Sequence, residues 1–250
     1  MNKIDTSELA TEARSETNDK TPRRSIRSFV IRAGRMTDGQ ERAWQELWPQ
    51  FGRDYSPTTI DLDALFGRNA PRILEIGFGT GDALIEYAQK YREHDCIGIE
   101  VHPPGVGHCL LKTKELQLSN VRVICHDAVE VLSNSLAPQS IDEVHIFFPD
   151  PWHKKRHHKR RLIQTPFVDL LDRVLKSGGI VKLGTDWENY AEQMLQVMTA
   201  HASFVNIASN AHPEVPSGFV ARPEHRPLTR FERRGQRLGH GVWDLKFQKR

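Results

Sequence analysis

The sequence predicts an α/β fold with a Rossmann-like, mostly parallel sheet, helices on both faces and an antiparallel C-terminal edge. Two observations support this prediction. After Pro71, short apolar runs alternate with amphipathic helical stretches, which is typical of βαβ units. A glycine-rich loop separates the first apolar run from the helix that follows it. Right-handed crossovers between parallel strands then place helices on both faces of the sheet.

The strands are expected where apolar residues cluster in runs of five or six. A helical stretch with apolar residues on one face is expected over 82–91, between the first two runs. Two later runs are expected to add edge strands after the parallel part of the sheet. The predicted strands are Arg72–Ile76, Cys96–Glu100, Val121–Cys125, Glu143–Phe148 and Ile180–Gly184, followed by Ser203–Ala208 and Val242–Phe247 at the edge.

Before this domain, the composition changes along the chain. Residues 1–22 are expected to form a disordered acidic tail, because residues 1–20 hold five acids and three bases with few large apolar side chains. Residues 23–60 are predicted to be a basic arm and a helix packing on the core, and residues 61–250 the main domain. The arm, from Pro22 to Arg35, is either a solvated basic segment or a segment that contacts phosphates.

The helix before the main domain is expected over residues 38–51. Asp38 is the predicted N-cap, with Glu41 three residues later in a capping-box pattern. An apolar stripe of Trp44, Leu47, Trp48 and Phe51 is expected to face the core.

Composition excludes several classes of protein. No apolar stretch in the 250 residues reaches the roughly 18 that a membrane helix needs, and the N-terminal residues lack the apolar core of a secretory signal. The three cysteines Cys96, Cys109 and Cys125 are odd in number and form no CxxC pair, which disfavours disulfides and structural zinc. We expect a cytoplasmic protein with no membrane partner.

The glycine loop predicts the kind of ligand. Gly77, Gly79 and Gly81 follow the first strand in a G-x-G-x-G spacing, which permits a tight turn and a close approach of a ligand to the backbone. Glu75 lies inside the strand, two residues before the first glycine. A carboxylate there is poorly suited to a pyrophosphate and well suited to a cation such as the amino group of a methionine moiety. This favours S-adenosylmethionine over NAD.

Two more acids follow the next two strands. Glu100 ends the second strand, where a carboxylate can accept hydrogens from a ribose diol in either kind of cofactor site. Asp127 follows the third strand and either accepts from an adenine amino group or caps the next helix, and both roles are compatible. Ligands of open α/β sheets bind at this edge, so three acids at successive strand ends indicate one site.

The loop after the fourth strand combines an acid with a basic block. Asp150 lies between two prolines, which stiffen the loop. Six Lys or Arg residues follow within residues 154–161, beside Trp152. This predicts a polyanion partner, and RNA fits best. His153 and His157 have the spacing of metal ligands, but the surrounding positive charge repels a cation, so no metal site is expected.

Together these motifs resemble the bacterial tRNA (guanine-N7-)-methyltransferases, which are class I S-adenosylmethionine-dependent methyltransferases. The resemblance rests on L-E-I-G-F-G-T-G, G-I-E-V-H, F-F-P-D-P-W-H-K-K-R-H-H-K-R-R, G-T-D-W and T-R-F-E-R-R-G-Q-R-L-G-H-G-V-W-D-L, and covers about residues 28–248. It implies that residues 61–250 form a methyltransferase domain, and that the target is the guanosine at position 46 in the variable loop of tRNA.

The resemblance also implies residue roles. Glu75, Glu100, Asp127 and Asp150 are implied to hold S-adenosylmethionine, and Asp150 is the proposed catalytic residue. The implied RNA-contacting block comprises Arg156, His157, His158, Lys159, Arg160 and Arg161. Lys154, Asp186, Thr229, Arg230, Phe231 and Glu232 are implied to contact the substrate. Capping a helix is the alternative for Asp186, and a capping box the alternative for Thr229 with Glu232.

The chemistry of the target limits the mechanism. Guanine N7 has a free lone pair and carries no proton, so no general base is needed. We expect Asp150 to orient the base and stabilise the positive charge that develops on it, without abstracting a proton.

Other functions remain compatible with parts of the sequence. An NAD-dependent oxidoreductase would explain the glycine loop and Glu100 but not Glu75 or the basic block. A non-catalytic RNA-binding module would explain the basic residues but not the three acids at strand ends. A methyltransferase acting on another RNA or on a protein is a third alternative. No DNA partner is expected, and a monomer is slightly favoured over a homodimer.

Overall fold

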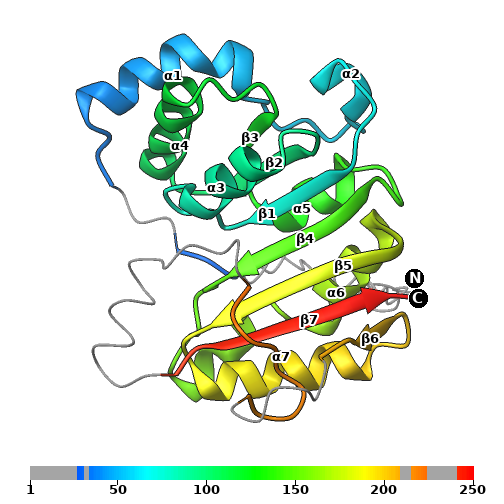
Figure 1. Cartoon of the computed structure of the whole chain (residues 1–250). Coiled ribbons are helices and arrows are strands. Elements are labelled where there is room, and N and C mark those ends of the chain that lie inside the picture. Colours follow the sequence, from blue (N-terminus) through cyan, green and yellow to red (C-terminus); the bar gives the residue numbers. More distant parts are fainter. Residues whose placement is uncertain (1–26, 31–33, 209–214, 224–240) are drawn as a thin grey trace, which may run out of the picture.

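One mixed sheet organises the protein. The computed structural model describes residues 27–30, 34–208, 215–223 and 241–250. In these residues seven strands form a single sheet in the order β3-β2-β1-β4-β5-β7-β6 (Figure 1). The first five pair in parallel, and β7 pairs antiparallel with both β5 and β6. The strands are β1 (Arg72–Ile76), β2 (Asp95–Glu100), β3 (Val121–Cys125), β4 (Ile141–Phe147), β5 (Leu175–Thr185), β6 (Phe204–Asn206) and β7 (Trp243–Lys249).

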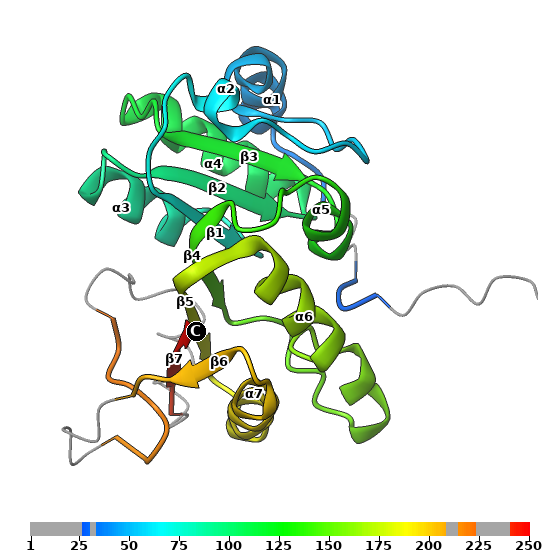
Figure 2. The same cartoon turned by 90° about the vertical axis from the view of Figure 1, so that its right-hand side faces the viewer.

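The helices pack in two groups on opposite faces of the sheet (Figure 2). The larger apolar cluster contains residues of α5 (Ala128–Asn134), α6 (Thr165–Val174) and α7 (Glu188–Ala200). The smaller cluster contains residues of α1 (Asp38–Phe51), α3 (Asp82–Lys90) and α4 (Pro103–Glu115). The short α2 (Leu62–Phe66) and the 3₁₀ helix η1 (Lys155–Arg160) complete the described elements. Among the described residues, no helix is long and apolar enough to cross a membrane.

The predicted fold class is confirmed, and so are the positions of the strands. The bounds of β1 and β3 agree with the predicted ones. The largest difference is in β5, which begins at Leu175 and not at Ile180. Ser177, Gly178 and Gly179 hide the start of this strand in the sequence because they are weak strand formers. The pairing of Ile141 with Leu175, next to a register shift, shows that β4 and β5 meet earlier than expected.

Helix α1 spans the predicted residues 38–51, but its predicted N-cap was wrong by one residue. Thr37 is the N-cap, and its side chain accepts from the backbone N–H of Gln40 at 3.3 Å while the Gln40 amide oxygen accepts from Thr37 N–H at 2.9 Å. The expected stripe faces the core: Leu47 and Phe51 are buried. Trp44 and Trp48 are half-buried and stack on each other with ring centroids 4.4 Å apart.

The strand order creates a switch point between β1 and β4. From β1 the chain proceeds through β2 to β3 on one side of the sheet, and then returns to β4 on the other side. Loops that leave the carboxyl ends of strands at such a point diverge and leave a crevice, where ligands of open α/β sheets bind. The glycine loop after β1 and the loop after β4 therefore border the same crevice.

Candidate active site

A cavity of about 350 Å³ lies at the carboxyl ends of β1 to β4. Four strand ends and one distant segment contribute most of its lining. These are Ile76–Gly77 after β1, Ile99–His102 after β2, His126–Ala128 after β3, Phe147–Asp150 after β4, and Ser28–Val30 from the arm. The structure thus brings four of the predicted cofactor residues to one cavity: Gly77, Glu100, Asp127 and Asp150. The volume is within the usual range of small-molecule sites.

Glycine is required in the loop after β1 for two reasons. Gly77, Gly79 and Gly81 all have positive φ angles of 74°, 58° and 82°, in the left-handed region that favours glycine. At Gly81, which caps α3, a Cβ atom would in addition lie 2.8 Å from the Cys109 sulfur. Gly79 and Gly81 support the turn but do not line the cavity, in contrast to Gly77.

The Glu100 carboxylate braces this loop. Its Oε2 accepts from Gly79 N–H at 2.7 Å, and its Oε1 accepts from Val101 N–H at 2.6 Å and His102 N–H at 3.0 Å. Burial raises the pKa of Glu100, and these three N–H donors oppose the rise. Because a carboxylate offers about four acceptor positions, one acceptor position of the Glu100 carboxylate remains for a ligand.

Glu75 does not line the cavity, although the next two residues of the chain, Ile76 and Gly77, do. The residue is 3% exposed, and its buried Oε2 has no hydrogen-bond partner among the described residues. Burial, followed by the charges of Glu100 and Asp82, raises the pKa of Glu75 from 4.5 to about 8. An orphaned carboxyl oxygen beside a glycine loop is an acceptor without a donor, and burying one costs free energy unless a ligand compensates for it.

Asp127 serves as a helix cap and also borders the cavity. Its Oδ1 accepts from Val129 N–H at 3.0 Å at the start of α5, so the capping alternative is confirmed. The residue is half-buried and belongs to the cavity lining.

The loop that carries Asp150 has an unusual backbone. Phe148 and Trp152 have φ angles of 53° and 49°, although neither is a glycine. Bulky residues in this region are strained, and such strain is concentrated at functional sites. Between them, Asp150 is exposed at the mouth of the cavity, and Phe148 N–H is anchored to Gly184 O at 2.8 Å. The strained ends and the two prolines hold the Asp150 carboxylate in a defined position.

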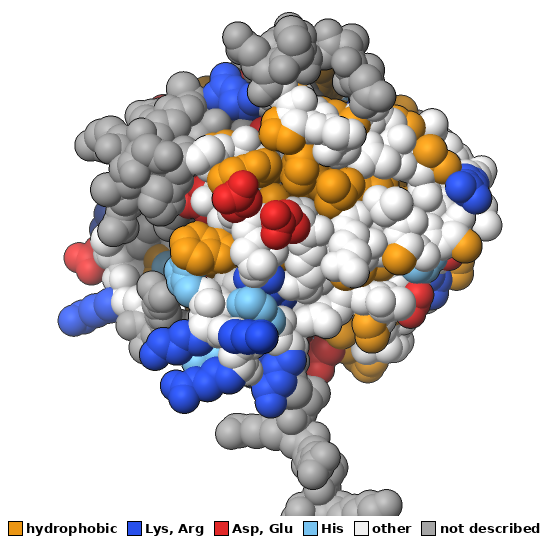
Figure 3. Space-filling model, turned by 90° about the horizontal axis from the view of Figure 1, so that it is seen from below, with side chains coloured by type: hydrophobic (Ala, Val, Ile, Leu, Met, Phe, Trp, Pro, Cys, Tyr) orange, Lys and Arg blue, Asp and Glu red, His pale blue; other side chains and the backbone are white. Residues whose placement is uncertain are grey.

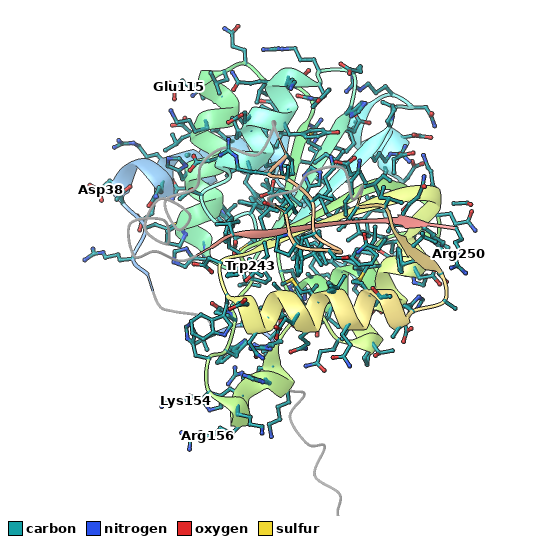
Figure 4. The ribbon with its side chains drawn as sticks, turned by 60° about the horizontal axis from the view of Figure 1, so that its bottom comes forward. Asp38, Glu115, Lys154, Arg156, Trp243 and Arg250 are labelled. Carbon is teal, nitrogen blue, oxygen red and sulfur yellow. The ribbon has the colours of Figure 1, made fainter. Side chains whose placement is uncertain are left out.

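The basic block forms η1 and the turn before it. Lys154 and Arg156 project away from the sheet at the tip of this loop (Figure 4). Lys154, Lys155, Arg156 and Lys159 are exposed, whereas His157 and His158 are half-buried. On the face seen from below, Lys, Arg and His side chains gather in one area (Figure 3). Desolvation and the neighbouring cations, Arg156 and Lys154 first, lower the pKa of His157.

Arg161 differs from the rest of the block, and the expectation that it contacts RNA is corrected. It is buried, and its guanidinium lies 4.7 Å from the centre of the Tyr190 ring. All five of its N–H donors have partners within the protein: Pro151 O, Asn189 O, Asn189 Oδ1, Gln193 Oε1 and His158 Nε2. Because no donor is left for a phosphate, Arg161 anchors the block to α7 from within.

Arg160 binds the arm. Its guanidinium stacks 4.0 Å from the Trp152 ring centre and donates to Arg27 O at 3.1 Å and Phe29 O at 3.2 Å. The Trp152 indole N–H donates to Ser28 O at 2.9 Å. These contacts hold Ser28–Val30 as one wall of the cavity. Sequence reasoning missed this wall, since the only signal was the run of arginines on either side of it.

The remaining predicted residues are placed as follows. Asp186 is half-buried after β5 and does not cap α7, whose N-cap is Trp187. Trp187 and His153 meet edge-on with ring centroids 4.3 Å apart, and Trp152 and His157 meet edge-on with centroids 5.9 Å apart. His153 and His157 therefore have different ring partners. Thr229, Arg230, Phe231 and Glu232 lie outside the described residues, as does the tail 1–22.

Comparison with known proteins is consistent with this site. A family model described as a putative methyltransferase matches residues 69–245. The tRNA (guanine-N(7)-)-methyltransferase of Thiobacillus denitrificans is 57% identical over 94% of this chain and 100% of its own length. The enzyme of the same name from Shewanella piezotolerans is 55% identical over 90% of this chain and 93% of its own. Among solved structures, that of PH0851 has a TM-score of 0.56 at 13% identity over 72% of this chain and 43% of that chain, a likeness of fold alone.

The matched residues include β1, the acids at the strand ends, the Pro-Asp-Pro-Trp loop and the basic block. At more than half identity over nine tenths of the chain, the likeness extends well beyond the glycine loop that many α/β proteins share. This chain belongs to the family of tRNA (guanine-N(7)-)-methyltransferases.

Proposed function

We propose that this protein transfers the methyl group of S-adenosylmethionine to N7 of a guanosine in tRNA, with position 46 of the variable loop as the target. One observation supports the proposal most directly. A single cavity is bordered by a glycine loop, by acids at successive strand ends and by Asp150, and the exposed basic block begins four residues after Asp150. The relatives named above are named for methylation of guanine N7 in tRNA.

The acids fit this cofactor. The orphaned Glu75 oxygen offers an acceptor for an α-ammonium group, and the charge of that group would compensate for the burial of the carboxylate. Glu100 has one acceptor position left for a ribose hydroxyl, and Asp127 has a second oxygen for the adenine amino group. When bound, S-adenosylmethionine would supply a methyl group on a sulfonium, which is an electrophile that needs no activation by the protein.

The protein's own task is then to align the two reactants. Guanine N7 attacks with its lone pair, so no residue must remove a proton. The strained loop holds Asp150 where it can accept from the N1–H or N2–H of the base, and its charge stabilises the positive charge that the purine acquires. Most of the rate enhancement comes from this alignment.

The roles within the basic block divide by exposure. Lys154, Arg156 and Lys159 are exposed and are proposed to bind phosphates, with His157 and His158 beside them. Arg161 has all of its donors engaged within the protein and positions the block. Arg160 uses two donors to hold the arm and remains a proposed phosphate contact through the others. Asp186 and Thr229–Glu232 remain proposed substrate contacts.

Methyl transfer from labelled S-adenosylmethionine to unmodified tRNA, followed by nucleoside analysis, tests the proposal. We expect N7-methylguanosine with the wild-type protein, none with Asp150→Ala, and wild-type amounts with the control Glu86→Ala, which changes an exposed acid on α3. Cofactor binding without transfer to tRNA would refute tRNA as the substrate. No cofactor binding at all would refute the proposal that Glu75, Glu100 and Asp127 bind S-adenosylmethionine.

A further inference from the structure

The wall of the cavity at the end of β3 contains an aromatic pair that the roles assigned above do not use. Tyr55 and His126 stack with ring centroids 3.7 Å apart and an angle of 7° between their planes. His126 lines the cavity, whereas Tyr55 lies behind it and does not. One face of the imidazole is thus covered by protein.

Backbone pairing between the segment after α1 and β3 places these two rings next to each other. Gly52 forms a parallel bridge with Val123 of β3, and Arg53 N–H donates to Val123 O at 2.8 Å. In parallel pairing the two chains advance together, so Tyr55, three residues after Gly52, lies level with His126, three residues after Val123. The segment after α1 therefore extends the sheet edge far enough to bring Tyr55 behind the cavity.

Both rings are fixed from outside the cavity. Asn134 donates to the Tyr55 hydroxyl at 2.9 Å, and Ser135 Oγ donates to Ser56 O at 2.7 Å, which ties the segment to the end of α5. The His126 Nε2 is hydrogen-bonded to Glu130 in the first turn of the same helix. With one face against Tyr55 and Nε2 at Glu130, the other face of the ring is left for the cavity.

The position along the sheet indicates which part of the cofactor meets this face. Asp150 follows β4 and Glu100 ends β2, and β3 is the strand beyond it. Three steps of about 4.8 Å separate β4 from β3, or about 14 Å across the crevice. With the methyl group at Asp150 and the ribose at Glu100, the purine reaches the end of β3.

We propose that His126, held by Tyr55 and Glu130, positions the cofactor by stacking on its purine. This rests on the proposed use of S-adenosylmethionine. Tyr55, His126 and the purine then form a stack of three flat rings, of which two are aligned before the ligand arrives. Such prealignment reduces the freedom lost on binding. Tyr55 is a positioning residue because it acts only through His126.

Ligand titrations of the full chain test the inference. We expect His126→Ala and Tyr55→Leu to weaken binding of S-adenosylhomocysteine by about 3- to 10-fold, the range of one aromatic contact. 5′-Methylthioadenosine lacks the amino-acid end, and its binding should weaken by the same factor. Tyr55→Phe retains the ring and should lose less than Tyr55→Leu. Binding of tRNA should not change.

A second Tyr–His pair provides a matched control. Tyr91 and His94 stack with ring centroids 5.4 Å apart just before β2, at the amino end of the strand and so at the opposite end from the cavity. His94→Ala removes an imidazole of the same kind without approaching the cavity, and it should leave cofactor affinity unchanged. A loss as large as that of His126→Ala would indicate general destabilisation and would overturn the inference.

A spectroscopic signature separates stacking from an indirect effect. On saturation with S-adenosylhomocysteine, the Cε1–H resonance of His126, assigned with His126→Asn, should move upfield because the purine ring current shields it. An unmoved resonance with normal ligand binding would overturn the stacking inference and leave the proposed function intact. No binding of S-adenosylhomocysteine by the wild-type protein would refute the proposed cofactor itself.

Discussion

Glu75 yields the most demanding prediction, because burial and the neighbouring acids raise its pKa from 4.5 to about 8. Between these two pH values the folded protein keeps a proton on Glu75 that the unfolded chain has released. The unfolding free energy must therefore fall as pH rises from about 4.5 to about 8 and change no further through this group above that range. At about 1.4 kcal/mol for each pH unit, the total loss is about 5 kcal/mol.

Glu75→Gln removes this titration while retaining most of the shape of the side chain. We expect the difference in unfolding free energy, variant minus wild type, to grow by about 1.4 kcal/mol per pH unit between pH 5 and pH 8. Urea denaturation at pH 5, 6, 7 and 8 measures it, and other titrating groups cancel because both proteins contain them. Parallel stability curves for the two proteins would refute a raised pKa at Glu75.

The same ionisation governs ligand binding if Glu75 pairs with an ammonium group. Because the carboxyl must then lose its proton, the affinity for S-adenosylhomocysteine should rise nearly tenfold per pH unit from pH 6 to 7.5. Calorimetry in two buffers of different ionisation enthalpy should detect the release of about one proton. For Glu75→Gln we expect weak binding with no pH dependence over this range. A flat wild-type profile would separate Glu75 from the cofactor.

Four further predictions concern the loop after β4. Asp150→Asn should lower kcat at saturating cofactor by about 100-fold or more with little change in cofactor affinity, and the wild-type kcat should not keep rising tenfold per pH unit above neutrality. Arg156→Ala should weaken tRNA binding and reduce the slope of the logarithm of the binding constant against the logarithm of salt concentration by about 1. Arg161→Ala should instead lower the unfolding free energy by roughly 2–4 kcal/mol, because five internal hydrogen bonds are lost. Arg160→Lys keeps the positive charge but loses the fixed geometry of the two hydrogen bonds to the arm, so amide hydrogen exchange of residues 28–30 should become faster. Unchanged exchange would contradict the conclusion that Arg160 holds the arm.

Much of the fold could be predicted because its signals are local. The apolar runs of β1 and β3 have definite ends, and the helix over residues 38–51 has a strict stripe. The errors arose where local signals compete. Thr37 and Asp38 are both good caps, and only the backbone geometry selects the first. The early start of β5 depends on the pairing of Leu175 with Ile141, and the residues Ser177 and Gly178 give no local signal of that pairing.

The candidate site shows the same division. The acids at the strand ends were predicted to meet because parallel strands bring their carboxyl ends to one edge. The direction and partners of each side chain were not predictable. Glu100 has three of its acceptor positions filled by backbone N–H groups, one from the glycine loop and two from the residues that follow Glu100, and Arg161 has all of its donors engaged within the protein. In the sequence both residues are indistinguishable from neighbours that remain free to bind a ligand.

The sequence by itself therefore determined the order of strands and helices, the edge at which the acids meet and the charge of the loop beside them, since these follow from spacing and residue type. Only the tertiary structure decided which charged side chains are available to bind a ligand and which are engaged within the protein. The arm reaches the cavity because Trp152 and Arg160 hold it there, more than a hundred residues away in the chain. Tyr55 reaches His126 because a bridge at Gly52 sets their register. Contacts of this kind depend on packing between distant segments, which hydrophobic periodicity does not encode.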